Sequence, residues 1–399
     1  MFFGARRLPL FYSVLLLALI SFSSINYGHI APPDPQSVGN AGYRYLWLGD
    51  IPAAIQAFEN ARQLDPAFPY RWSDLGGAYA IAEASDKAAS CFRRAVTLAP
   101  QSPQIALRAA NFFFSNNLSG EALMLGAEVL RQTDGFDQSV FRSYVRLGGT
   151  QDQILNSGIG ADPRAARAYF QFLLAGATRE QLETVWRWMD SNAYIDPDSA
   201  RGWTDWLFHA GSAGDAVKVW EEHVASNRAF YRKPANPESS WIDNGSFEAD
   251  WRGGAFDWND VPVAGVATAI DRKVVHSGQK SLRLTVDSSD NLDYHQFFQR
   301  TWLEPGNYRV EGWIRTQAFS TDQGIGLQII DPAHPAELNV STDALTGNKD
   351  WTMVSQDFTV ADGARLAEIR IVRRPSWDFD NHPRGTAWVD DLRIVRRSR

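Results

Sequence analysis

The chain has 399 residues, of which 44% are apolar and 21% charged, with a formal net charge of −7 and a single cysteine. The length favours two or three domains, because a single core stops growing at about 250–300 residues. The apolar fraction excludes wholesale disorder, and the negative charge argues against a dedicated nucleic-acid binder. One cysteine excludes a disulfide framework and any cysteine-rich metal site.

The N-terminus reads as a targeting or anchoring segment. Arg6 and Arg7 precede the uncharged run LPLFYSVLLLALISF, and the stretch from Leu8 to Ile25 is close to the shortest that can span the hydrocarbon core of a bilayer. A short basic region followed by such a run is typical of a signal peptide or signal anchor. We therefore predict an anchor and linker over residues 1–34, with the rest of the chain outside the cytoplasm, that is, facing the periplasm or exterior. A cleaved signal, and hence secretion, remains the alternative, although Ser21-Phe22-Ser23 is a poor cleavage site.

A 34-residue repeat follows the anchor. Alignment of Pro35 with Pro69 brings eight pairs of identical residues into one register: Pro35/Pro69, Gly42/Gly76, Tyr45/Tyr79, Ala54/Ala88, Phe58/Phe92, Ala61/Ala95, Leu64/Leu98 and Pro66/Pro100. Each unit predicts two antiparallel helices, with Gly76 and Ala88 small where the helices cross and Pro100 closing the second unit. This pattern resembles the tetratricopeptide repeat over residues 35–68 and 69–102, with a degraded copy over 103–136.

Helical patterns continue to about residue 230. Thr178 and Gln181 have the spacing of a capping box, and Ala216 and Trp220 take the small and aromatic positions of another pair. We predict one α-solenoid over residues 35–230. The resemblance implies that its concave face, built from the first helix of each pair, binds a peptide or partner protein. Arg44, Arg71 and Arg108 are nearly in register and are candidates for an arginine ladder that holds carboxylates, with a solvated surface as the alternative.

The C-terminal third changes from helical to strand periodicity. Residues 231–240 form a Pro-, Ser- and Asn-containing linker, and residues 241–399 contain alternating segments such as YRVEGWIRT and TAWVDDLRIV between turn signals. This predicts an antiparallel β-sandwich or jelly roll, and hence a multidomain α + β chain. The succession from NGSFE at residue 244, through HSGQKSLRL and LEPGNYRVEGWIR, to VDDL at residue 389 resembles carbohydrate-binding modules of the galactose-binding-like superfamily.

That resemblance implies a structural Ca²⁺. Glu248 and Asp390 would supply side-chain oxygens and the turn at Ser277 would add backbone carbonyls, which suits a hard cation. Strand parity places Trp388, Asp390, Leu392 and Ile394 on one face, and an inward carboxylate is costly unless it is paired or coordinated. The alternative is that Asp390 accepts hydrogen bonds from backbone amides or pairs with an arginine.

A sugar site needs an aromatic platform beside hydrogen-bonding side chains on one sheet. Parity within YRVEGWIRT turns Tyr308, Val310, Gly312 and Ile314 toward the core, so Trp313 and Glu311 face away from it. We expect Gln328 and Arg370 on the same sheet. Trp258, Tyr294 and Trp377 are expected in loops that rim a cleft, and simple packing is the alternative for each of these residues.

The search for catalytic motifs is negative. The seven histidines are scattered, no H-E-x-x-H, G-x-S-x-G or Walker A motif is present, and the solenoid and module leave no segment for a catalytic domain. The sequence predicts a non-enzymatic, exported, membrane-anchored protein whose repeats bind a protein and whose jelly roll binds a glycan, which suits assembly or export of an extracellular polysaccharide. An excess of 33 Arg over 6 Lys hints at a bacterial source. A pure protein–protein scaffold and an unrecognised glycan-active enzyme are the alternatives.

Overall fold

A computed structural model describes residues 35–147, 149–224, 240–361, 363, 365–377 and 382–397. The predicted anchor (1–34) and most of the predicted linker (231–240) therefore lie outside the described residues. Within the described ranges, no helix is both long and apolar enough to cross a membrane. The chain divides into two compact units between Tyr194 and Ile195, so the last helical pair belongs to the same unit as the sheets.

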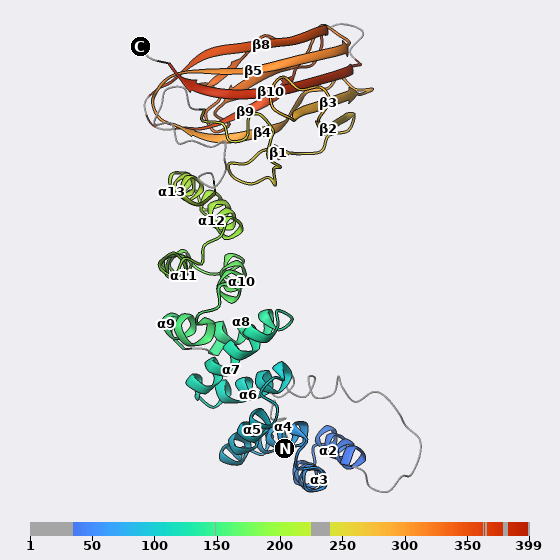
Figure 1. Ribbon diagram of the computed structural model, residues 1–399, viewed down its shortest axis with the longest axis vertical. Helices are drawn as coiled ribbons and strands as arrows, with labels where there is room; N and C mark the ends of the chain where they lie inside the picture. Colours follow the sequence, from blue (N-terminus) through green and yellow to red (C-terminus); the bar gives the residue numbers. More distant parts are fainter. Residues whose placement is uncertain are drawn as a thin grey trace, which may run out of the picture. The chain divides into compact units, whose positions relative to one another are not determined.

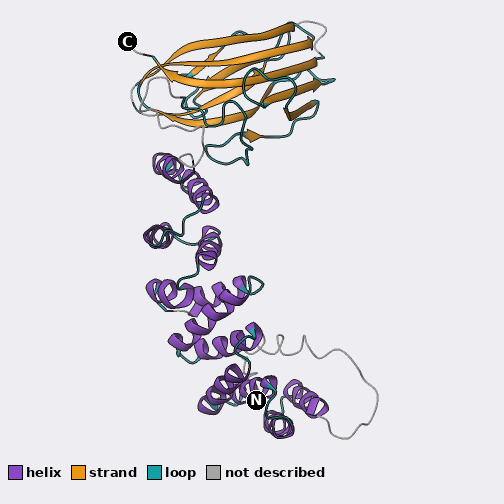
Figure 2. Ribbon diagram, viewed as in Figure 1, coloured by secondary structure: helices purple, strands orange, loops and turns teal. Residues whose placement is uncertain are grey.

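The first unit is a succession of helices that pack in consecutive pairs (Figures 1 and 2). Their bounds are α2 (Pro35–Leu48), α3 (Ile51–Leu64), α4 (Pro69–Ile81), α5 (Ser85–Leu98), α6 (Pro103–Ser115), α7 (Ser119–Gln132), α8 (Asp137–Leu147), α9 (Gln151–Gln153), the π-helical turn η1 (Ile154–Ile159), α10 (Pro163–Leu174) and α11 (Arg179–Ser191). The capping box at the start of α11 is confirmed, since the Thr178 hydroxyl accepts from the Gln181 amide and the Gln181 side chain accepts from the Thr178 amide. The predicted helix-pair solenoid is thus the observed fold of this part of the chain.

Close helix crossing explains the small residues of the repeat. A Cβ atom placed on Gly42 would lie 2.6 Å from the Phe58 ring, and one on Gly76 would lie 3.1 Å from the Phe92 ring. Ala54 and Ala88, which face the same crossings, are fully buried. In the first two pairs the glycine of the first helix therefore packs against the aromatic ring of the second, at the close crossing that the repeat pattern predicts.

The second unit consists of a helical pair and a β-sandwich (Figure 2). The pair is α12 (Pro197–His209) and α13 (Ala213–Val219), which continues into the π-helical turn η2 (Trp220–Val224). The strands are β1 (Asn259–Asp260), β2 (Val266–Asp271), β3 (Ser281–Asp287), β4 (Tyr294–Leu303), β5 (Gly306–Phe319), β6 (Gly326–Ile330), β7 (Asn339–Ser341), β8 (Gly347–Val360), β9 (Arg365–Arg373) and β10 (Arg384–Arg396). They form two antiparallel sheets, with strand orders β1-β4-β9-β6-β7 and β2-β3-β10-β5-β8, around one apolar core. This confirms the predicted jelly roll.

A bulge in β10 reverses the predicted direction of Asp390 relative to Leu392. The residues of β10 and β5 pair regularly up to Asp390 opposite Trp313, and the register then shifts before Arg393. Asp391 occupies the bulge with φ of 51°. One extra residue reverses the side-chain alternation. Asp390 therefore lies on the outer face beside Trp313, whereas Leu392 lies in the core, and the prediction that they share a face is wrong.

Candidate functional site

Trp313 lies on the outer face of its sheet, as predicted, but it is not a free platform. The His276 ring stacks on the Trp313 ring with centroids 4.0 Å apart and an interplanar angle of 16°. Trp351 contacts the same imidazole edge-on at 5.6 Å. Glu311 lies two residues away on β5, where it faces Arg393 of β10 and Ser355 of β8. The chain's own imidazole therefore occupies the ring face that a sugar would need.

Gln328 and Arg370 lie on the other sheet, so the expectation that they share a sheet with Trp313 is wrong. Gln328 of β6 pairs directly with Arg370 of β9, and both strands belong to the β1-β4-β9-β6-β7 sheet. Alternation within each strand cannot reveal which strands join into one sheet, because that depends on long-range pairing. The structure thus separates the predicted sugar-binding residues into two groups on opposite faces of the sandwich.

The group on β6 and β9 forms part of a continuous set of polar side chains. We call this set the polar strip; it consists of Gln328, Asn339, Ser341, Glu368, Arg370 and Arg374. Gln328 Nε2 donates to Asn339 Oδ1 at 2.9 Å, and the Arg374 guanidinium donates to Ser341 Oγ at 2.9 Å. Glu368 is buried and accepts both Nε (2.8 Å) and Nη2 (2.6 Å) of Arg370. These bonds hold amide, guanidinium and hydroxyl groups in fixed positions.

Trp377 follows the polar strip, three residues beyond Arg374. Its side chain is 94% exposed, the largest value among the exposed large hydrophobic residues of the described chain. The preceding residue is fixed by two reciprocal bonds, Ser376 N to Asn291 Oδ1 and Asn291 Nδ2 to Ser376 O, each 2.8 Å long. An exposed indole on an anchored backbone is available to stack on a flat apolar surface.

Trp258 and Tyr294 do not rim a cleft. Trp258 is fully buried, stacks on Phe297 and donates its indole N–H to Asn244 O at 3.0 Å. Tyr294 begins strand β4 and is buried in the same core, where burial raises the pKa of its phenol. Both side chains stabilise the sandwich, and the expectation that they line a loop site is corrected.

The residues implied as calcium ligands hold a turn instead. Asp390 Oδ2 accepts the amides of His276 (2.9 Å) and Ser277 (3.2 Å), while Glu248 Oε1 accepts the amides of Gln279 (2.6 Å) and Lys280 (3.0 Å). Calcium requires six to eight oxygen ligands, and N–H donors compete with a cation for the same lone pairs. Among the described residues, no group of three His, Cys, Asp or Glu side chains could hold a metal ion. The arrangement does not fit calcium, and the amide-binding alternative describes it.

The three arginines of the repeats have different environments and do not form a ladder. Arg108 pairs with the buried Asp74 at 2.9 Å, and Asp74 also accepts the Tyr43 hydroxyl at 2.5 Å. Burial, followed by the charge of Asp74, raises the pKa of Tyr43. Arg44 is exposed on α2. The 34-residue spacing aligns Arg108 with Asp74 rather than with another arginine, so the register of the repeat pairs opposite charges.

Arg71 is a buried guanidinium with no carboxylate partner in the described part of the chain. It is 9% exposed, and its Nε has no hydrogen-bond acceptor. Its guanidinium carbon lies 5.2 Å from the Phe68 ring centroid, and a Cβ on Gly39 of α2 would lie 2.5 Å from its Nη1. Burial of a cation without an acceptor is costly. Arg71 is therefore the arginine of the three that is suited to an incoming anion.

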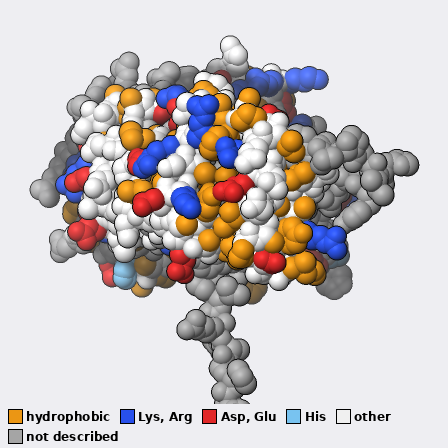
Figure 3. All heavy atoms as spheres, turned by 90° about the horizontal axis from the view of Figure 1, so that it is seen from below, with side chains coloured by type: hydrophobic (Ala, Val, Ile, Leu, Met, Phe, Trp, Pro, Cys, Tyr) orange, Lys and Arg blue, Asp and Glu red, His pale blue; other side chains and the backbone are white. Residues whose placement is uncertain are grey.

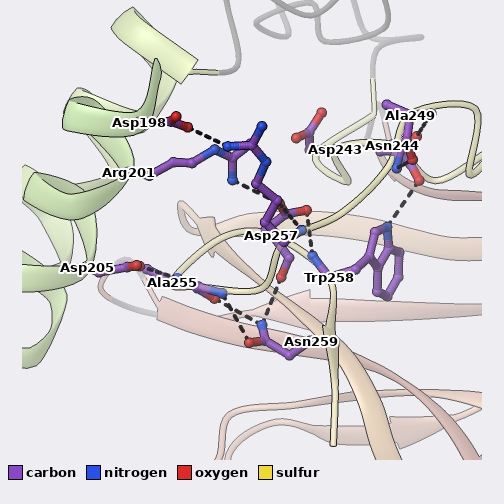
Figure 4. A network of polar contacts seen from close by, with 12 residues as sticks. Asp198, Arg201, Asp205, Asp243, Asn244, Ala249, Ala255, Asp257, Trp258 and Asn259 are labelled. Atoms are coloured by element: carbon purple, nitrogen blue, oxygen red, sulfur yellow. Dashed lines mark hydrogen bonds and ion pairs between the residues drawn. The ribbon is translucent and has the colours of Figure 1, made fainter. Parts of the chain in front are cut away.

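Sequence reasoning missed a network that joins α12 to the first loop of the sandwich (Figure 4). The figure shows Arg201 and Asp205 of α12 facing Asp257 and Ala255 of the loop. Arg201 Nη1 lies 2.9 Å from Oδ2 of the fully buried Asp257, and Asp205 Oδ1 accepts the Ala255 amide at 2.6 Å. Gly254 has φ of +115°, and a Cβ on it would lie 2.9 Å from Asp205 Oδ1, so only glycine fits this approach.

Apolar contacts reinforce this junction. Phe256 lies between Phe208 and Trp220, with ring centroids 6.1 Å from each. The Arg300 guanidinium of β4 lies 5.1 Å from the Phe208 ring centroid. The helical pair is thus packed on the sandwich by both charge pairs and rings, which is why it belongs to the sheet unit. In the sequence, the glycines and acidic residues of the segment DWRGGAFDWND could have indicated this junction.

Comparison with known proteins gives likenesses at low identity. No family model matches the chain, and no curated protein matches it. One similar solved structure is a family 16 carbohydrate-binding module, with 19% identity, coverage of 39% of this chain and 99% of the other, and a TM-score of 0.28. Another is the TmCBM61 module in complex with β-1,4-galactotriose, with 15% identity, coverage of 40% of this chain and 100% of the other, and a TM-score of 0.25. A third is the TPR2B domain of yeast Sti1 in a pHsp70 complex, with 15% identity, coverage of 28% of this chain and 94% of the other, and a TM-score of 0.27. The fold described above is established by this chain's own helix packing and strand pairing.

Proposed function

We propose that the protein is a non-enzymatic, exported and membrane-anchored bacterial protein that binds a glycan through its sandwich and a protein through its repeats. The glycan would be an extracellular polysaccharide in assembly or export. The observation that supports glycan binding is the polar strip with the exposed indole of Trp377 beyond it. Fixed amides, guanidinium groups and hydroxyls bind sugar hydroxyls, while an indole stacks on the apolar face of a pyranose.

Affinity electrophoresis of the full chain through gels that contain single polysaccharides tests this function. We expect retardation by at least one polysaccharide, and a reduction of about tenfold in affinity for Trp377→Ala or Gln328→Ala, which corresponds to one lost stacking or hydrogen-bonding group. Met353→Ala is the matched control, because Met353 is half exposed on β8 of the opposite sheet. Unretarded migration in every gel would favour the pure scaffold function.

The unpartnered Arg71 guanidinium supports a second binding activity, toward an acidic segment of a partner protein. A carboxylate that reaches Arg71 would supply the acceptor that its Nε lacks, and a charged pair in a partly desolvated site is stronger than one at the surface. Fluorescence polarisation with labelled hexaglutamate and hexalysine peptides provides the measurement. We expect preference for hexaglutamate, lost in Arg71→Gln and retained in Arg94→Gln, since Arg94 is an exposed arginine of α5. Equal binding by both variants would exclude Arg71 from the site.

A further inference from the structure

The last turn of α2 exposes several large apolar side chains. Trp47 is 69% exposed, Leu48 60% and Tyr45 38%, and Arg44 lies beside them. We call these four residues the α2 face. Figure 3, a view from below Figure 1, shows apolar side chains interspersed with charged ones. Large exposed apolar groups placed together mark an interaction surface.

The position of Arg44 is covered by the preceding helical pair in later repeats. The residue one repeat after Arg44 is Ala78, which is fully buried in the same apolar cluster as Leu46 and Phe58 of the first pair. The residue one repeat after Ala78 is Phe112, which stacks on Phe92 of the second pair with centroids 4.9 Å apart. Arg44 is thus at a packing position of the repeat, whereas Ala82, one repeat after Leu48, and Ser115, two repeats after Trp47, are exposed. No described residue precedes α2 to cover its last turn.

Arg44 distinguishes between possible coverings of this face. A further helical pair would bury a guanidinium where the later repeats have Ala78 and Phe112, and nothing in the described chain would pair with it. A membrane surface imposes no such cost, because Trp and Tyr favour the headgroup level, Leu reaches the acyl boundary, and Arg is attracted to anionic lipids. The composition of the α2 face therefore fits a lipid surface better than a dry protein interface.

The predicted anchor would place this face close to a membrane. The apolar run that ends at Ile25 is the predicted anchor, and residues 26–34 connect it directly to Pro35, the first residue of α2. Nine extended residues span at most about 30 Å. A tether of this length gives an effective concentration in about the millimolar range, so weak insertion of a few side chains suffices to hold the helix on the surface.

We infer that the α2 face lies on the anionic membrane surface beside the anchor, with Trp47 and Leu48 inserted at the headgroup level. This inference rests on the proposed membrane anchoring. It assigns the first repeat a lipid contact in place of a preceding repeat.

Site-specific labelling of the full chain in vesicles tests the inference. The single cysteine, Cys91, is buried, and burial raises the pKa of its thiol to about 11, which keeps it unreactive; it is also replaced in Cys91→Ala. Leu48→Cys carries an environment-sensitive fluorophore, and Met124→Cys on α7 is the control, because Met124 is 62% exposed and apolar. The chain is reconstituted into vesicles of phosphatidylcholine mixed with the anionic lipid phosphatidylglycerol, with and without spin-labelled lipid.

We expect quenching by spin-labelled lipid to be about threefold or more stronger at position 48 than at position 124, with a blue-shifted emission at position 48 alone. Trp47→Ser or Arg44→Gln should reduce that difference. Co-flotation with vesicles and equal quenching at both positions would overturn the inference but leave anchoring intact. A blue shift that depends on protein concentration rather than on lipid would indicate a second copy of the chain and overturn it as well. Failure to co-float would overturn both the anchoring and the inference.

Discussion

The helical repeats and the β-sandwich are stabilised by polar contacts of different sequence range. In the repeats, Tyr70 donates to Gln104 and Arg108 pairs with Asp74, and both pairs join positions 34 residues apart. In the sandwich, the amide of His276 donates to Asp390, 114 residues away. Repeat stability is therefore a sum over neighbouring pairs, whereas the sandwich closes as one cooperative unit. Substitutions in the two regions should differ in how far their effects spread.

The largest expected effect is that of Trp258→Ala in the sandwich. The variant removes a fully buried ring that packs on Phe247 and Phe297, and it removes one of the two donors to the Asn244 carbonyl, which keeps the Phe247 amide. We expect the free energy of unfolding of the sheet unit to fall by about 3–5 kcal/mol. Hydrogen exchange followed by mass spectrometry should show lost protection throughout the strands and unchanged protection in α4–α7. Trp377→Ala, an exposed control, should change stability by less than about 0.5 kcal/mol.

The second prediction concerns the Asp74–Arg108 pair of the repeats. Arg108→Met leaves the buried Asp74 carboxylate with only the Tyr43 hydroxyl, which should cost about 3 kcal/mol. The loss of exchange protection should be confined to α2–α6, because each pair contacts only its neighbours. The double variant Asp74→Leu/Arg108→Met should regain most of the stability. Equal loss of protection in α10 and α11 would show that the helices unfold as a single unit.

The same contrast explains how much could be predicted from the sequence. The repeat pattern placed Gly76 and Ala88 at a close helix crossing, which the structure confirms, because identical residues at a fixed period imply identical contacts. Within one strand, alternation also gave the outward direction of Trp313 correctly. Alternation failed at Asp391, where one residue with positive φ reverses it, and no local signal marks that bulge.

Long-range placement was the other source of error. The sequence could not show that Gln328 and Arg370 belong to the sheet opposite Trp313, nor that His276 covers Trp313, since both depend on pairing between distant strands and loops. The polar strip itself contains two of the predicted residues. Its remaining members, and the anchoring of Trp377 by Ser376, follow only from the three-dimensional arrangement.

The third prediction concerns the junction between a helical pair and the sandwich, where the two kinds of region meet. Arg201→Met removes the guanidinium that lies 2.9 Å from the fully buried Asp257, and the Arg201 side chain is itself only 16% exposed. We expect a loss of about 2–3 kcal/mol. Exchange should increase in both α12 and the loop 250–258, so this effect crosses from helix to sheet. Arg252→Met, which removes the two-thirds exposed pair with Asp198, should cost less than about 1 kcal/mol.

The smallest effect, and the one most specific to the sandwich, is a pH dependence that arises from Asp390. Burial is the largest cause that raises the pKa of Asp390, to about 6, and the Asp391 carboxylate also raises it. Hydrogen bonds from the amides of Ser277 and His276 oppose this shift by lowering the pKa. Between about pH 4 and 6 the Asp390 carboxyl group keeps its proton in the folded state but loses it in the unfolded chain. This contribution to stability is therefore present below pH 4 and is lost as pH rises through 6.

Denaturant unfolding of the full chain and of Asp390→Asn between pH 3.5 and 7.5 measures this contribution. The stability of the wild type relative to Asp390→Asn should fall as pH rises through the window, and the difference should be constant above about pH 7. Asp357→Asn supplies a control of opposite sign, because hydrogen bonding to Arg309 lowers the pKa of Asp357, so its contribution is lost as pH falls. A relative stability for Asp390→Asn that does not change with pH would show that the turn at His276 opens to water, and the sandwich would then be less cooperative at this edge than its long-range contacts imply.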